Sequence, residues 1–352
     1  MTIVYILVAV VFFGILIAVH EAGHFAAAKA CGVRVDEFSI GMGPALFKKQ
    51  GKETLYSLRC IPIGGFCAMS GEDELSDDPR AFTNQKPWKR VIILVAGAFM
   101  NFLLGLLIIA VLYANAKAFS APVIQDFMEG CPYESADGLQ KGDRFWKIDG
   151  HRVYQYYNVS EFLAEGDGNH DIVIIRDGKK TELKDYHFVP VEYEGYADKM
   201  YGFYFGYEEA TFGVKLRNTW STAMEFCRMV WMGLDQLFSG KAGVQDLSGP
   251  VGIVDYMAET GKNSATVGDA ISNIAYFGAF IAVNLAVMNM LPIPALDGGR
   301  VALLLVTWVI ESITGKKLDP KYEGYIHAAF MILLLALMAY VMFNDIFRIV
   351  TG

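Results

Sequence analysis

The sequence comprises 352 residues, of which 54% are apolar and 19% are charged, with a formal net charge of −8. This length is sufficient for two domains, but so apolar a chain is not typical of soluble ones. Nothing in this acidic balance suggests binding to nucleic acid, so we expect no nucleic-acid partner.

Four segments without charged side chains are long enough, or nearly so, to cross a lipid bilayer. They are residues 1–19, 91–114, 270–296 and 324–344, and a helix needs about 20 apolar residues to span the hydrocarbon. The sequence therefore predicts a multi-pass protein of the cell (inner or plasma) membrane. A secretory signal is the alternative for the first segment, but such signals begin with basic residues and the first lysine is Lys29.

A titratable cluster, His20, Glu21 and His24, follows the first apolar segment. Residues i and i+4 of a helix share a face, so the two histidines can bind one metal ion with Glu21 beside them as a general base. This is the His-Glu-x-x-His arrangement of zinc hydrolases. The alternative is a pair of histidines hydrogen-bonded inside a helix bundle. Ionisable groups in a membrane are costly and usually functional, so we expect zinc.

Residues 55–69 (LYSLRCIPIGGFCAM) predict a β-hairpin between the first two spans. Residues with β propensity lie on both sides of Gly64 and Gly65, where we expect the turn. The segment is unusually apolar for a cytoplasmic loop.

Lysine and arginine residues near the spans predict the orientation. Three of them, within residues 86–90, precede the second span, and four more lie between the third and fourth spans. Cytoplasmic loops carry such an excess. We therefore expect residues 30–90 and 298–323 in the cytoplasm, and both termini and residues 115–269 outside.

The outer segment is predicted to contain a small mixed α/β module over residues 120–190. A helical pattern near residues 158–165 precedes a strand that turns at Asp177-Gly178. Beyond the module, apolar residues over 216–238 recur at a helical period, which predicts a helix at the outer membrane surface or against the spans. Two cysteines, at 131 and 227, lie in this segment, where a disulfide between them could persist.

A catalytic zinc ion usually has three protein ligands and one water. Asp297 is a lone acid after the uncharged residues 270–296, on a segment bent by two prolines. Its carboxylate can be the third ligand, or it can cap a helix that starts near Gly298; the residues alone favour neither. His327, in the fourth span, is more typical of a packed or hydrogen-bonded residue.

The chain resembles the site-2 proteases, zinc metalloproteases that cut within membranes. The similarity rests on HEAGH and LDGG and extends to the bacterial PDZ-containing branch, the regulator of sigma-E protease type. The strings that match this branch are FSIGMGPALF (38–47), IPIGGFCAMSGE (61–72), AGAFMNF (96–102), LSGPVGI (247–253) and NMLPIPALDGG (289–299). In the outer module, GLQKGD and IDG resemble a PDZ domain of that branch.

The resemblance implies a role for each matching residue. It implies that His20, His24 and Asp297 bind zinc and that Glu21 is the catalytic base. Asn284 and Asn289 would contact substrate, although a buried asparagine can equally bridge helices. Asn101 matches an asparagine of the second span, and the spacing of Gly97 and Gly105 around it first predicts close packing. The 55–69 segment matches a membrane-associated β-loop, and we expect an unwound substrate to add to it as a strand near Gly64 and Gly65.

The implied fold is a polytopic α-helical membrane protein with four transmembrane helices, N-out and C-out, an inserted extracytoplasmic PDZ-like α/β module and a membrane-associated β-hairpin. The expected division is 1–116 (first half of the protease core), 117–195 (PDZ-like domain), 196–265 (amphipathic connecting segment) and 266–352 (second half of the core).

The function implied is zinc-dependent cleavage of single-span membrane proteins, such as anti-sigma factors or signal-peptide remnants, in or near the bilayer. The PDZ-like module would bind a peptide or a C-terminus, or would exclude untrimmed substrates. The alternatives are a non-catalytic PDZ membrane scaffold and a metal transporter. A transporter would require several intramembrane metal sites along a path, and a scaffold would not require Glu21.

Overall fold

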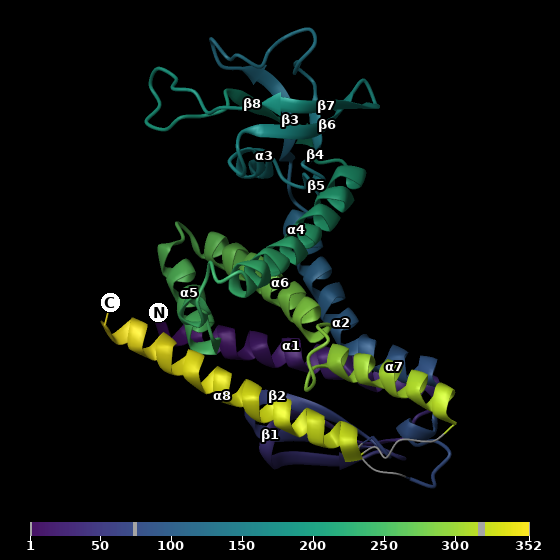
Figure 1. The fold of residues 1–352 in the computed structure, drawn as a ribbon. Coiled ribbons are helices and arrows are strands. Elements are labelled where there is room, and N and C mark those ends of the chain that lie inside the picture. The colour runs from purple at the N-terminus through teal and green to yellow at the C-terminus, as the bar shows by residue number, and fades with distance from the viewer. Residues whose placement is uncertain (1, 73–75, 316–320, 352) are drawn as a thin grey trace. The chain divides into compact units, whose positions relative to one another are not determined.

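The computed structural model describes residues 2–72, 76–315 and 321–351 (Figure 1). The chain divides into two compact units. Residues 1–108 and 226–352 form one, called here the membrane unit, and residues 109–225 form the other, called the sheet unit.

The membrane unit is mainly helical. Its longer helices are α1 (Thr2–Cys31), α2 (Pro87–Tyr113), α5 (Pro250–Asn263), α6 (Val267–Asn289), α7 (Asp297–Thr314) and α8 (Lys321–Thr351), with single 3₁₀ turns at Phe82–Asn84 and Val244–Asp246. Helix α2 ends in the sheet unit. Among the described residues, α1, α2, α6 and α8 are long and apolar enough to cross a membrane. The prediction of a polytopic protein with four spans is confirmed at this level.

Two of the spans differ from the charge-free segments that predicted them. Helix α1 continues to Cys31, because the residues after the histidines are mostly alanine and favour helix. The titratable cluster, at the end of the charge-free segment, therefore lies within the candidate span. The third predicted segment, 270–296, is not one helix: α6 ends at Asn289 and α7 starts at Asp297. Two prolines in between prevent the helix from continuing.

Helices α1 and α2 approach each other closely. A Cβ atom at Gly23 of α1 would lie 2.9 Å from the carbonyl carbon of Ala96 and 2.9 Å from Cγ of Met100 on α2. Small residues allow this approach in a membrane, where packing and polar contacts drive helix association. The glycine inside HEAGH is thus required by the neighbouring helix.

The sheet of the membrane unit corrects the predicted hairpin. Residues 55–69 form one bent strand, β2 (Leu55–Met69), which pairs with β1 (Val35–Gln50), and Gly64-Gly65 is not a turn between paired strands. Residues 35–40 of β1 have partners on both sides, 55–58 and 65–69 of β2, while residues 45–50 pair with 55–59. A strand from earlier in the chain therefore separates the two arms of the expected hairpin.

The sheet unit contains strands β3 (Ala118–Phe127), β4 (Arg144–Ile148), β5 (His151–Arg152), β6 (Asn169–Arg176), β7 (Lys179–His187) and β8 (Phe203–Glu209), together with α3 (Tyr157–Leu163) and the first half of α4 (Phe212–Phe238). The strand order is β7-β6-β4-β3-β8, with β5 on β4. The predicted turn is present: Asp177 and Gly178 both have positive φ, as a two-residue hairpin turn requires.

Strand β8 extends the sheet beyond the boundary predicted at residue 195. It pairs with β3, some 80 residues earlier, and lies at one end of the strand order. Residues after it form α4, which confirms the helix predicted over 216–238. Buried polar groups hold α4 against α3: Asn158 Nδ2 donates to Glu225 Oε1 at 3.2 Å.

Candidate metal centre

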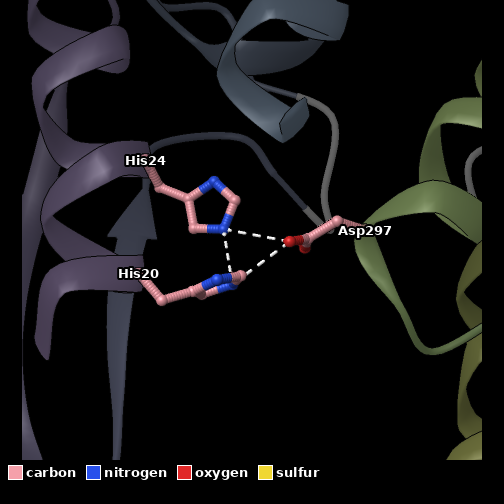
Figure 2. Close-up of side chains that lie close together, drawn as sticks. All are labelled: His20, His24 and Asp297. Atoms are coloured by element: carbon pink, nitrogen blue, oxygen red, sulfur yellow. Dashed lines mark hydrogen bonds and ion pairs between the residues drawn. The ribbon is translucent and has the colours of Figure 1, made fainter. Parts of the chain in front are cut away.

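His20 and His24 project from one face of α1 toward the first residue of α7 (Figure 2). His20 Nε2 and His24 Nε2 lie 3.1 Å apart, and Asp297 Oδ2 lies 3.1 Å from the first and 3.3 Å from the second. Within the described part of the chain, these three residues form the one group that could hold a metal ion. The structure therefore brings together side chains separated by more than 270 residues.

The distances suit zinc. Zinc bonds of about 2.0–2.1 Å in a tetrahedral site place neighbouring ligand atoms about 3.3 Å apart, close to the three distances observed. His24 Nδ1 donates to the carbonyl oxygen of Ile93 at 2.8 Å, which leaves the lone pair of Nε2 facing the other two groups. A cation at the centre would satisfy these lone pairs, so the donor set fits the metal.

Helix α2 packs against the two histidines. Ile93, Gly97 and Asn101 are spaced by four residues and so share one helix face. Asn101 Nδ2 lies 3.3 Å from His20 Nδ1, and its buried Oδ1 has no partner among the described residues. Rotating this amide by 180° lets Oδ1 accept the Nδ1 proton, which frees His20 Nε2 to bind a metal.

Gly97 makes room for both rings. A Cβ atom there would lie 2.8 Å from Cε1 of His20 and 2.7 Å from Cε1 of His24. The sequence pointed only to close packing at Gly97 and Asn101. Their four-residue spacing with Ile93 was the available signal that all three face one neighbour.

Asp297 is the first residue of α7 and does not cap it. The residue before the helix is Leu296, whose side chain makes no capping hydrogen bond, and the carboxylate of Asp297 faces the histidines instead. The preceding loop folds back over the helix start, so that a Cβ at Gly299 would lie 2.6 Å from the nitrogen of Pro294. The two glycines after Asp297 therefore permit the turn that presents it.

A cavity of about 360 Å³ opens beside these groups. Its lining residues are His20, Glu21, His24, Phe66, Cys67, Ala68, Met69, Glu72, Leu94, Asp297 and Arg300. One wall is the end of β2, and at Gly65 a Cβ would lie 3.3 Å from Cγ of Glu21. Arg300 and Glu72 form an ion pair across the cavity wall. The predicted base thus shares a cavity with the three candidate ligands.

The other predicted site residues are not gathered here. Asn284 and Asn289 lie on α6 and are not among the residues that line this cavity, and neither are Gly64 and Gly65. All five cysteines are free thiols, Cys131 and Cys227 included.

Glu53, in the connection between β1 and β2, links the sheet to the end of α1. Glu53 Oε1 accepts a hydrogen bond from Lys29 Nζ at 2.7 Å, and its Oε2 accepts one from Arg80 at 2.8 Å. These two cations lower the pKa of Glu53 to about 2. The sheet that forms one cavity wall is thereby attached to the helix that carries the histidines.

Comparison with known proteins places the chain in a family. The model of peptidase family M50 matches residues 8–337. A predicted zinc metalloprotease of Clostridium acetobutylicum is 34% identical over 346 residues, which cover 97% of each chain. Zinc metalloprotease RasP of Oceanobacillus iheyensis is 28% identical over 97% of this chain and 98% of the relative. The regulator of sigma-W protease RasP of Bacillus subtilis is 24% identical over 97% of each chain.

The match covers nearly the whole chain and decides against a metal transporter or a non-catalytic scaffold. The four candidate spans agree with a membrane protease. The chain therefore belongs to peptidase family M50, the site-2 protease family, and is a zinc-dependent metalloendopeptidase.

Proposed function

We propose that this enzyme cleaves single-span membrane proteins in or near the bilayer, at a zinc ion held by His20, His24 and Asp297. The observation that carries the proposal is the convergence of their three ligand atoms within 3.3 Å of one another, beside Glu21 in one cavity. The relative named as a regulator of sigma-W protease supports a membrane-protein substrate, such as an anti-sigma factor or a signal-peptide remnant.

Glu21 acts as the general base and acid. When bound, zinc supplies Lewis acidity, which acidifies water and polarises a peptide carbonyl. Glu21 accepts a proton from the attacking water and delivers it to the leaving amine. Asn101 and the carbonyl of Ile93 hold the two imidazoles in the orientation required.

The end of β2 receives the substrate. A helical substrate hides its carbonyls in backbone hydrogen bonds and must unwind before cleavage, and an unwound segment in lipid leaves those groups unpaired. Residues 65–69 pair on one side only among the described residues, and four of them line the cavity. A substrate strand added along this edge would regain its hydrogen bonds directly beside Glu21.

The sheet unit is a PDZ-like module that contacts the substrate outside the membrane. Strand β8 is an edge strand of the sheet and carries exposed aromatic side chains, Tyr204 and Tyr207 among them. An extended peptide or C-terminus adds to such an edge. The positive residues around the spans favour the cytoplasmic side for the metal site and the outer side for this module.

The proposed chemistry is tested by Glu21→Gln. We expect the loss of cleavage of a tagged single-span substrate by about 10²–10⁴-fold, because the amide cannot accept the proton. Zinc content should stay at the wild-type level. Glu53→Gln, which removes a carboxylate outside the cavity, is the matched control. Cleavage that survives in the Glu21→Gln enzyme contradicts the mechanism.

Strand addition is tested by placing proline in turn at Phe66, Cys67 and Ala68. The N–H groups of a strand alternate between its two sides, so proline should spare the sheet only where the N–H faces the open edge. Such variants should keep zinc and lose cleavage. Full activity in every folded variant would reject the substrate-binding role of this edge.

The role of the sheet unit is tested by excising residues 118–209. The residues that flank this segment are adjacent, since the N–H of Ala210 donates to the carbonyl of Lys117 at 3.0 Å. Lys117 can therefore be joined directly to Ala210. Broader cleavage of substrates with intact outer domains would indicate exclusion, and loss of all cleavage would indicate recruitment.

A further inference from the structure

The loop that presents Asp297 contains a strained residue. Ala295 has a φ of +84°, in the left-handed region that residues with a Cβ atom rarely adopt. A residue in that region persists only where its surroundings hold it there. Ala295 is two residues from Asp297, so whatever fixes its backbone also sets the direction of the carboxylate.

His327 of α8 contacts this residue. The backbone N–H of Ala295 donates to Nδ1 of His327 at 3.0 Å. Among residues 324–330 of α8, His327 alone is half-buried, and the other six are exposed. An imidazole thus turns inward from an otherwise exposed stretch of helix to meet the loop.

Helix α8 is attached elsewhere by a second polar contact. Asp345, fully buried near the other end of the helix, accepts hydrogen bonds from the N–H groups of Gly249 and Gly252 at 3.0 and 2.8 Å. Most of the side chains between the two contacts are exposed. The position of α8 is therefore fixed at one end on α5 and at the other on the ligand loop.

We propose that His327 is a positioning residue for the metal site: its Nδ1 lone pair holds Ala295 in the left-handed conformation that directs Asp297 at His20 and His24. This rests on the proposed role of Asp297 as a zinc ligand. This function requires the hydrogen-bond acceptor at Nδ1 and does not require the volume of the ring. Supporting groups of this kind typically change metal affinity by about 10–100-fold when removed.

Two substitutions in the full-length enzyme separate these contributions. His327→Phe keeps a ring but removes the acceptor, and His327→Asn keeps an acceptor near the position of Nδ1 but removes the ring. Tyr325→Ala, at an exposed site on the same helix, is the control. The apparent zinc affinity is measured by competition with a chelator, next to cleavage at limiting and saturating zinc.

We expect His327→Phe to weaken zinc binding about ten-fold and to recover cleavage at saturating zinc. His327→Asn should stay within about two-fold of the wild type and of Tyr325→Ala. Unchanged affinity in His327→Phe, or a loss in His327→Asn as large as in His327→Phe, overturns the proposal. If His20→Ala binds zinc as tightly as the wild type, the proposed metal site itself fails, which is a different result.

Discussion

The two halves of the proposed metal site, His20 with His24 and Asp297, are positioned by different kinds of contact. His20 and His24 stand on one face of a continuous helix, and α2 fixes both rings through Ile93 and Asn101. Asp297 follows a loop that folds back on itself, passes through a left-handed Ala295 and is hydrogen-bonded to another span. The histidine half is held by close helix packing, and the aspartate half by a few specific backbone contacts. The histidine half should therefore respond to added volume, and the aspartate half to changes in the loop backbone.

Among changes to the two halves, the largest effect is expected from Gly97→Ala, which acts on the histidine half. The new Cβ would overlap both imidazoles, and neither ring can move without leaving its hydrogen-bond partner. Misplacing a reacting group by about 1 Å costs on the order of 100-fold in rate, and zinc content should fall as well. Cleavage and zinc content are measured together. Gly233→Ala, in a helix with open space around the glycine, is the control and should be neutral.

The next effect is expected from Gly299→Ala, which acts on the aspartate half. Its Cβ would overlap the backbone of the loop near Pro294, so the loop must shift and carry Asp297 with it. Overpacking of this kind costs about 1–3 kcal/mol. The thermal midpoint and zinc content should both fall, whereas Gly268→Ala, early in α6 with its nearest contact at 3.7 Å, should change neither. Normal zinc binding in the Gly299→Ala enzyme would show that the loop can shift without displacing Asp297.

A smaller effect is expected from Asn101→Ala. Without the amide, His20 loses the partner that selects its tautomer, and zinc affinity should fall about ten-fold while the helices still pack. Asn101→Asp, which keeps an acceptor for the Nδ1 proton, should bind zinc more tightly than the alanine variant. Equal affinities for the two variants would show that Asn101 only fills space.

The smallest effect is expected outside both halves, at Glu53. Its pKa is lowered to about 2 by Lys29 and Arg80, so its contribution to stability is present above the unfolded value of 4.5 and is lost as the pH falls through about 2. Glu53→Gln should therefore lower the thermal midpoint slightly at pH 7 and by less at pH 2. Glu53 and Lys29 are only half-buried and Arg80 is exposed, and ion pairs so close to solvent contribute little. Activity at pH 7 should be unchanged, because Glu53 does not line the cavity.

The local features of the sequence predicted the elements well. Long uncharged segments indicated four spans, Asp177-Gly178 marked a hairpin turn, and a helical period identified α4. The hairpin assigned to residues 55–69 was wrong, because the strand that separates its arms comes from residues 35–40. Strand β8 was missed for the same reason, since its partner lies far away in the chain. Non-local pairing leaves no local pattern.

The sequence by itself predicted the histidine half of the proposed site and, through resemblance, the family and Asp297 as a ligand. Two histidines four residues apart share a helix face whatever surrounds them, because the helix period is fixed. Only the tertiary structure decided that Asp297 faces them and does not cap α7, and that Asn101, Gly97 and His327 surround the site. Those contacts join separate helices, and their geometry depends on how the helices pack.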